Sequence, residues 1–362
     1  MANPTVLITG SSGCLGGAVI QCLRDRLPDA SLFALDISTP TTDKSTPGVE
    51  YLQADICDTS AIPKILSRIQ PQVIIHTAGL VPSAAWRLGV GDAGLRAVNT
   101  EGTQNLLDAA RAAGSVVAFV YTSSCVVVKG DNWMDLEYVN ESITPPQKFD
   151  ELYAETKAIA EHKVLSSASS GFKTAAIRPC GIIGPNDNTL VPVMAVTPRR
   201  ISIGRGTNLY DFTSAENAAL AHVLAVENLL SPSKEGSLSA NGKAFFVTDQ
   251  RPMPMRRLME MIWECLDHGQ VQTNSEEIQG NPVVVPIVFV YALVWIVSLV
   301  ANAFGKVPMF TAADLGAGVS ARYFDNSLAR DVLGYVPRAR LEDSIRDACK
   351  SYKTRQGELR TS

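Results

Sequence analysis

The sequence has no excess of positive charge. Its 362 residues carry 32 Lys and Arg against 36 Asp and Glu, a formal net charge of −4. A protein that binds a nucleic-acid backbone needs a cationic surface to neutralise the phosphates. We therefore expect no nucleic-acid partner.

Cysteine and histidine show no metal or disulfide pattern. The seven cysteines are odd in number, scattered, and without Cys-x-x-Cys spacing. This argues against a structural metal site and a disulfide framework, and fits a reducing compartment. The first apolar run begins within a few residues of Met1, which leaves no room for a charged segment and an apolar core before it, so we predict no cleavable signal peptide. No repeat of fixed period is visible, and 46% hydrophobic residues can bury a substantial core.

The N-terminal stretch VLITGSSGCLGG predicts a strand, a glycine-rich turn and a helix. Its spacing, G-x-x-G-x-x-G, differs from the usual dinucleotide fingerprint, and an ordinary turn is the alternative. At such a turn one glycine bends the chain, the next admits a diphosphate and the third lets the helix pack closely, while unpaired N–H groups at the helix start attract the anion. The candidate pyrophosphate site consists of Gly10, Gly13, Cys14, Leu15 and Gly16.

A second apolar run ends in Asp36, twenty residues beyond Gly16. A carboxylate there can accept hydrogen bonds from both hydroxyls of an adenosine ribose. Because no arginine stands beside it to receive a 2′-phosphate, NAD is favoured over NADP as cofactor. Asp36 as the cap of a turn is the alternative.

Short apolar runs alternate with helical segments through the first half of the chain. This predicts an α/β fold of the Rossmann type, with a doubly wound parallel sheet covered on both faces. We expect a nucleotide-binding domain over 1–184 and a smaller substrate-binding region over 185–362, interleaved with the first. The expected strands are 5–9, 31–35, 49–53, 72–76, 116–122, 173–178 and 243–248, and the expected helices are 14–26, 60–70, 93–113, 151–169, 215–230, 253–268 and 341–352.

Several polar or small residues follow expected strands and so face the same crevice. Candidate cofactor contacts are Asp55 and Ile56 after the third strand, Ala78 after the fourth, and Asn99. Asn99 has local backbone bonding or a helix cap as its alternatives. His76 is a possible base, but its neighbours are apolar, which favours a buried structural histidine.

The candidate catalytic residues are Ser124, Tyr153 and Lys157. Four residues along a helix bring Tyr153 and Lys157 to one face, so the ammonium is expected to lower the phenol pKa and make a base available. Ser124 lies at the end of the fifth apolar strand and can hydrogen-bond the same substrate oxygen. By itself, Y-x-x-x-K is often only a solvated helix face.

The glycine turn at Thr9 to Gly16 and the Ser/Tyr/Lys set resemble the extended short-chain dehydrogenase/reductase superfamily. Within it the chain is most similar to the sterol-4α-carboxylate 3-dehydrogenases (decarboxylating) and the related 3β-hydroxysteroid dehydrogenase/isomerases. The finer match lies in YTSS at 121–124, AAIRPCGIIGPND at 175–187, IGRGTNLYDFTSAENAALAHVLA at 203–225, GKAFFVTD at 242–249 and YFDNSLARDVLGYVPR at 323–338.

The resemblance implies hydride transfer from a sterol-like 3β-alcohol to a nicotinamide. Tyr153 would take the hydroxyl proton, Lys157 would also bind the nicotinamide ribose, and Ser124 would position the hydroxyl. Pro179 matches a position that lines the nicotinamide pocket, or only shapes a loop. A 4α-carboxylate would then become part of a β-keto acid, which can lose carbon dioxide without a further residue. Cys180 stands where the decarboxylating relatives tend to carry histidine.

One apolar stretch, 283–303, bears on the substrate class. There is no charged residue between Glu277 and Lys306, and the stretch is long enough to cross a bilayer as one helix. The chain after it resembles part of the same catalytic fold, so we expect a segment that dips into or lies on one leaflet, on the cytosolic face of the endoplasmic reticulum or a lipid droplet. A fully buried core helix is the alternative.

Other functions remain open from the sequence. They are a triterpenoid or meroterpenoid 3-hydroxy/3-keto oxidoreductase without decarboxylation, a nucleotide-sugar epimerase, and a non-catalytic NAD-sensing regulator. The regulator is disfavoured because such proteins usually lose the tyrosine or lysine, and the epimerase because its substrate needs no membrane. A homodimer is possible.

Overall fold

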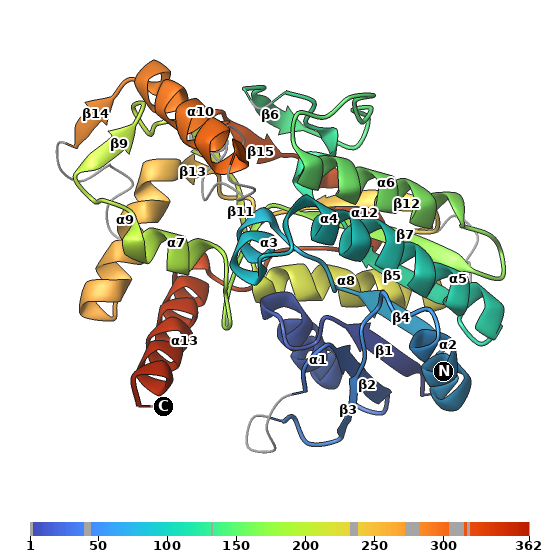
Figure 1. The fold of residues 1–362 in the computed structure, drawn as a ribbon. Coiled ribbons are helices and arrows are strands. Elements are labelled where there is room, and N and C mark those ends of the chain that lie inside the picture. Colours follow the sequence, from blue (N-terminus) through green and yellow to red (C-terminus); the bar gives the residue numbers. More distant parts are fainter. Residues whose placement is uncertain are drawn as a thin grey trace.

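A seven-stranded parallel sheet forms the centre of the protein (Figure 1). The computed structural model describes residues 3–39, 45–131, 133–231, 238–271, 282–303, 315–316 and 319–361. The strand order is β12-β7-β5-β4-β1-β2-β3. Successive strands are added on one side of β1 up to β3 and on its other side from β4 onward, and doubly wound sheets bind ligands at this switch between β1 and β4. The strands are β1 (Thr5–Thr9), β2 (Ser31–Asp36), β3 (Val49–Gln53), β4 (Val73–His76), β5 (Ala118–Thr122), β7 (Lys173–Pro179) and β12 (Lys243–Val247).

The central strands β1, β4 and β5 are buried on both faces of this sheet, which explains why they read as nearly continuous apolar runs. Alternate residues of β1 point to opposite sides: Val6 and Ile8 join one apolar cluster and Leu7 another. The first face is covered by α1 (Cys14–Arg26), α8 (Ala215–Leu230) and α12 (Ser327–Leu333); the second by α2 (Ala61–Ile69), α5 (Thr103–Ala113) and α6 (Leu152–Ser166). The predicted α/β Rossmann architecture is confirmed.

The helix expected over 93–113 is interrupted. It consists of α4 (Gly91–Arg96), a π-helical turn (Ala97–Gly102) and α5, and it follows the short helix α3 (Pro82–Leu88). Wide turns of this kind often occur at functional sites. Here the turn carries Asn99, whose side-chain amide donates to the carbonyl of Leu80 at 2.9 Å and accepts from its N–H at 2.7 Å. The wide turn therefore holds the loop after β4 in place.

A second, four-stranded sheet lies beyond the carboxyl edge of the first, and the sequence did not predict it. Its order is β13-β10-β15-β6, with strands β13 (Met253–Pro254), β10 (Leu209–Tyr210), β15 (Arg322–Phe324) and β6 (Leu136–Val139). Around it lie β8 (Gly181–Ile183) paired with β11 (Phe212–Ser214), and the helices α7 (Leu190–Val196), α9 (Met255–His268) and α13 (Leu341–Thr361). The second sheet thus unites strands far apart in the sequence.

The apolar stretch 283–303 is not one helix. Val283–Val285 form β14, which pairs with β9 (Ile201–Ile203), and α10 spans Ile287–Ala303. Most of its large side chains are exposed, including Phe289 at 70% and Trp295 at 59%. The alternative of a buried core helix is therefore wrong. Among the described residues, no helix has the length and apolarity needed to span a membrane.

Candidate active site

A cavity of about 610 Å³ opens at the carboxyl edge of the main sheet, beside the point where the strand order reverses. The glycine turn forms one wall, and the ends of β5 and β7 with the start of α6 form another. Of the predicted site residues, it is lined by Gly10, Gly13, Cys14, Leu15, Gly16, Ser124, Tyr153, Lys157 and Pro179.

The glycine turn is shaped as a phosphate cradle. Gly10 has φ +70°, and a Cβ there would lie 2.6 Å from the backbone nitrogen of Ala78. A Cβ on Gly16 would lie 2.2 Å from the carbonyl oxygen of Gly10, so the helix can approach the turn only without a side chain. Helix α1 begins at Cys14 with no side-chain cap and no acidic residue in its first turn. The turn therefore fits the pyrophosphate of a dinucleotide.

Asp36 lies at the end of β2, beside the glycine turn. Its carboxylate accepts hydrogen bonds from the backbone N–H of Ser12 at 2.9 Å and of Ser38 at 3.3 Å. These bonds tie the acid to the turn that faces the cofactor. Asp36 does not line the cavity itself, and its contact with a ribose stays a prediction.

The other predicted cofactor contacts also lie outside the cavity wall. Asp55 accepts a hydrogen bond from the N–H of Cys57 at 2.8 Å, and the carbonyl of the buried Ile56 accepts one from Asn105 at 2.6 Å. Ala78 contacts the glycine turn through its backbone. The side chain of Asn99 bonds local backbone, which was one of its alternatives.

Tyr153 and Lys157 lie one turn apart on α6 and reach the end of β5. The Tyr153 hydroxyl is hydrogen-bonded to Ser124. The Lys157 ammonium donates to the backbone carbonyl of Thr122 at 2.5 Å and lies 4.4 Å from the ring centroid of Tyr121. The structure therefore brings the three predicted catalytic residues to one cavity.

The electrostatics differ from the expectation that the ammonium acidifies the phenol. Burial raises the pKa of Tyr153, and the hydrogen bond with Ser124 offsets only part of that rise. Burial also lowers the pKa of Lys157 to about 7, while the charge of Glu161 opposes the shift. Burial is the largest cause of both shifts.

His76 is a structural residue, as its apolar neighbours predicted. It is fully buried, and its ring nitrogens hydrogen-bond the hydroxyls of Thr9 at 2.7 Å and Thr103 at 3.0 Å. Burial, with a smaller contribution from Lys157, lowers the pKa of His76 to about 3. The imidazole is therefore neutral and joins β1, β4 and α5.

The cavity also contains features that sequence reasoning missed. Cys125 and Cys180 follow β5 and β7, and their sulfurs lie 3.0 Å apart beside Ser124. Tyr210 lines the cavity from β10, with Arg322 behind it. Strand β10 has two residues and β15 three, too short for a pattern, so the sequence held no signal for this pair.

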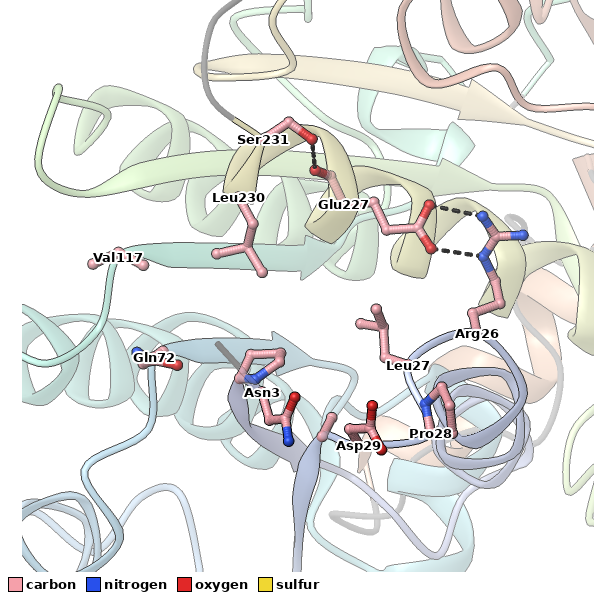
Figure 2. Close-up of a pocket in the computed structure, with 12 residues that line it drawn as sticks. Asn3, Arg26, Leu27, Pro28, Asp29, Gln72, Val117, Glu227, Leu230 and Ser231 are labelled. Atoms are coloured by element: carbon pink, nitrogen blue, oxygen red, sulfur yellow. Dashed lines mark hydrogen bonds and ion pairs between the residues drawn. The ribbon is translucent and has the colours of Figure 1, made fainter. Parts of the chain in front are cut away.

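A second cavity, of about 650 Å³, lies at the opposite end of the sheet (Figure 2). Asn3, Gln72 and Val117 border it just before β1, β4 and β5, and Arg26 forms a two-bond ion pair with Glu227 at its edge. The catalytic groups of a doubly wound fold lie at the carboxyl ends of its strands. We therefore place the active site in the first cavity.

Residues 7–275 match the 3-beta hydroxysteroid dehydrogenase/isomerase family. The chain belongs to this family. Among its relatives is the sterol-4-alpha-carboxylate 3-dehydrogenase (decarboxylating) of Schizosaccharomyces pombe, 34% identical over 96% of both chains. The Saccharomyces cerevisiae enzyme of the same description is 30% identical, over 94% of this chain and 95% of its own. The predicted membership of the 3β-hydroxysteroid dehydrogenase family is confirmed.

Solved structures of other enzymes share the fold of this family member. A UDP-glucose 4-epimerase from Thermotoga maritima, solved with UDP-glucose, aligns with a TM-score of 0.70 at 17% identity, over 97% of this chain and 99% of its own. The Thermus thermophilus UDP-glucose 4-epimerase, solved with NAD, aligns at 0.67 and 18% identity, over 96% and 99%. At these identities the likeness shows the fold alone.

Proposed function

We propose that this protein oxidises the 3β-hydroxyl of a sterol-like substrate with NAD and that a 4α-carboxylate on the product ketone leaves as carbon dioxide. The observation that carries the proposal is the placement of Ser124, Tyr153 and Lys157 in one cavity with a phosphate-binding glycine turn. The S. pombe and S. cerevisiae relatives, each aligned over more than nine tenths of this chain, carry names that describe this reaction.

In this mechanism Tyr153 removes the substrate proton, and Ser124 positions the substrate hydroxyl. The bound nicotinamide supplies the hydride acceptor. Tyr153 accepts the proton of the substrate hydroxyl, and Ser124, hydrogen-bonded to it, holds the same oxygen. Tyr153 acts as a base in its phenolate form, and the positive charge of the buried Lys157, one turn along α6, favours that form before the substrate proton arrives and neutralises it. Loss of carbon dioxide from the resulting β-keto acid needs no additional side chain.

NAD rather than NADP is part of the proposal. Asp36 places a carboxylate at the end of β2, where the 2′-phosphate of NADP would meet it. The carboxylate and the 2′-phosphate are both negative and repel each other, so Asp36 favours NAD, whose ribose has no phosphate.

We also propose that α10 lies on a membrane, on the cytosolic face of the endoplasmic reticulum or a lipid droplet. Between 282 and 303 there is no charged residue. A half-buried stripe on α10, comprising Ile287, Val290 and Val294, faces the protein, and the large apolar side chains on the rest of the helix are exposed. An exposed apolar surface of this kind is typical of a membrane or protein contact. A water-insoluble substrate makes the membrane the natural partner.

The test is to incubate the purified protein and NAD with a 3β-hydroxysterol, with and without a 4α-carboxylate. NADH absorbance reports oxidation, and trapped labelled carbon dioxide reports decarboxylation. We expect NADH formation in both cases and carbon dioxide only from the carboxylated sterol. NADH without carbon dioxide would favour a 3-hydroxy oxidoreductase without decarboxylation, and no NADH would contradict the proposal.

A further inference from the structure

Tyr210 and Arg322 form a joined pair at the edge of the active-site cavity. They are in register on the neighbouring parallel strands β10 and β15, so their side chains lie on the same face of the second sheet. Nη1 of Arg322 donates to the Tyr210 hydroxyl at 3.3 Å, and the guanidinium carbon lies 5.5 Å from the ring centroid. Because Tyr210 lines the cavity, it separates the guanidinium from the substrate space.

A second cation, Lys129, lies close to Arg322. Both side chains are buried, and in the part of the chain that the structure describes, Nζ of Lys129 and Nε and Nη2 of Arg322 have no hydrogen-bond partner. Burial and the nearby guanidinium lower the pKa of Lys129 to about 8. Two buried cations with unused donors are costly unless negative charge comes to them.

This cationic pair lies beside the catalytic residues. Lys129 follows Ser124 by five residues, and the backbone N–H of Asp150 donates to the carbonyl of Gly130 at 3.1 Å, next to the start of α6. Glu151, two residues before Tyr153, raises the pKa of both cations, and the exposed Asp131 does so for Lys129. Of these two carboxylates only Glu151 acts on Arg322, and in the described part of the chain two guanidinium nitrogens, Nε and Nη2, still have no hydrogen-bond partner.

The Tyr210 hydroxyl can donate a hydrogen bond to a ligand while it accepts one from the Arg322 guanidinium. Its oxygen accepts a hydrogen bond from Arg322, which leaves its own hydrogen to donate. Burial raises the pKa of Tyr210, so the hydroxyl keeps that hydrogen at neutral pH. A hydroxyl donor backed by a guanidinium is suited to an anionic acceptor.

We propose that Tyr210, backed by Arg322 and Lys129, binds the carboxylate of the substrate, next to the hydroxyl that Tyr153 deprotonates. The proposal rests on the proposed function and names the residues that distinguish a carboxylated sterol from an uncarboxylated one. The sterol carboxylate accepts a hydrogen bond from Tyr210 while its neighbouring hydroxyl lies at Ser124 and Tyr153.

The experiment compares kcat and KM for a 3β-hydroxysterol with and without a 4α-carboxylate in the full chain with NAD. Tyr210→Phe removes only the hydroxyl, and Arg322→Met removes the charge behind it. We expect either change to lower the ratio of kcat/KM values, carboxylated over uncarboxylated, about ten- to hundredfold, mainly through KM. Tyr323→Phe, one position along β15 with its hydroxyl near Glu137 at the surface, is the matched control and should leave the ratio unchanged.

The two sterols distinguish the possible failures. If the variants weaken both sterols equally, the pair has a structural role and the carboxylate assignment is overturned. An unchanged ratio in Tyr210→Phe overturns it as well, because that variant keeps the ring and its packing. If the wild-type protein oxidises neither sterol, the proposed function itself fails, and the assignment fails with it.

Discussion

The Lys157 ammonium donates a hydrogen bond to the backbone carbonyl of Thr122 at 2.5 Å. Thr122 is the last residue of β5, so the lysine is fixed to the sheet edge from which Ser124 also projects. Burial is the main reason why the pKa of the Tyr153 phenol is raised. The phenol must therefore lose its own proton, with a positive charge nearby to favour the phenolate, before it can accept one from a substrate.

Replacement of Tyr153 by Phe tests the assignment of the base. Removal of the hydroxyl should lower kcat by at least about 100-fold, because general base catalysis contributes about 10²–10⁴. NAD affinity, measured by fluorescence titration, should change little, since the ring and its packing are retained. The control Tyr335→Phe removes a buried hydroxyl that bonds the Thr248 carbonyl at 3.0 Å, far along the chain from the catalytic set. Wild-type turnover in Tyr153→Phe would exclude it as the base.

Asp36→Ala tests the cofactor preference. Loss of the carboxylate removes the repulsion that a 2′-phosphate would meet and also removes a ribose acceptor. We expect NAD to bind about tenfold more weakly and its advantage over NADP to narrow, measured as Kd for both cofactors. Asp29→Ala, an acid in the turn before β2, should leave the preference as in the wild type. If Asp36→Ala keeps the wild-type preference for NAD over NADP, Asp36 does not bind the ribose.

Most of the main sheet and its covering helices were predictable, because the central strands are buried on both faces and most of the helices are periodic. The bounds expected for β1 and α1 agree with the structure, and so do those of α8. The second sheet could not be predicted, because its strands have two to four residues and two of its three pairings join residues more than a hundred positions apart. The division at residue 184 stays a prediction.

The candidate site likewise contains residues that the sequence indicated and residues that it could not indicate. Ser124, two residues after β5, and Pro179, the last residue of β7, line the cavity, and their positions at strand ends indicated this edge of the sheet. Contacts that depend on the short strands, above all Tyr210 with Arg322, depend on tertiary pairing alone. The direction of the Tyr153 pKa was also beyond the sequence, because a four-residue spacing does not show where an ammonium points.

Breaking the buried ion pair between Arg178 and Glu161 should lower the free energy of unfolding. Nε and Nη2 of Arg178 donate to the two carboxylate oxygens at 2.8 and 2.6 Å, and both side chains are buried. Glu161→Gln leaves a buried cation without its counter-charge, so we expect a loss of about 3–5 kcal/mol in the free energy of unfolding. Urea unfolding measures it. Glu155 lies on the same helix as Glu161 and forms a half-exposed ion pair with Arg96, so Glu155→Gln should lower the free energy of unfolding by less than about 1 kcal/mol. Equal effects of the two variants would contradict this difference.

Asp211 predicts a pH dependence of stability. Burial raises its pKa to about 7, although the N–H of Phe324 donates to its carboxylate at 2.9 Å. An unfolded Asp has a pKa of about 3.9. Between about pH 4 and pH 7 the folded state therefore keeps a proton that the unfolded state has lost, and this group lowers stability as the pH rises.

Asp211→Asn removes this pH dependence of stability, because an amide does not titrate. The amide oxygen can still accept the hydrogen bond from the Phe324 N–H. Relative to the wild type, the variant should gain about 1–3 kcal/mol in the free energy of unfolding between pH 5 and pH 8. Urea unfolding at both pH values measures the gain. Asp108→Asn, on the exposed surface of α5, should show no such change. A variant-minus-wild-type difference that is the same at both pH values would exclude Asp211 as the titrating group.

The exposed side chains of α10 give the membrane proposal a direct test. Phe289 and Leu293 are 70% and 60% exposed, so replacing both by Glu should leave the fold intact in water. In contact with a bilayer, each apolar side chain contributes about 1.5–3 kcal/mol of burial that the double variant loses. Co-sedimentation with phosphatidylcholine vesicles should therefore fall by more than about tenfold. The matched control changes Tyr138 and Val336, which are 67% and 57% exposed on other parts of the surface, to Glu. If the control and the α10 variant sediment alike, the apolar helix is not the membrane contact and the membrane proposal is wrong.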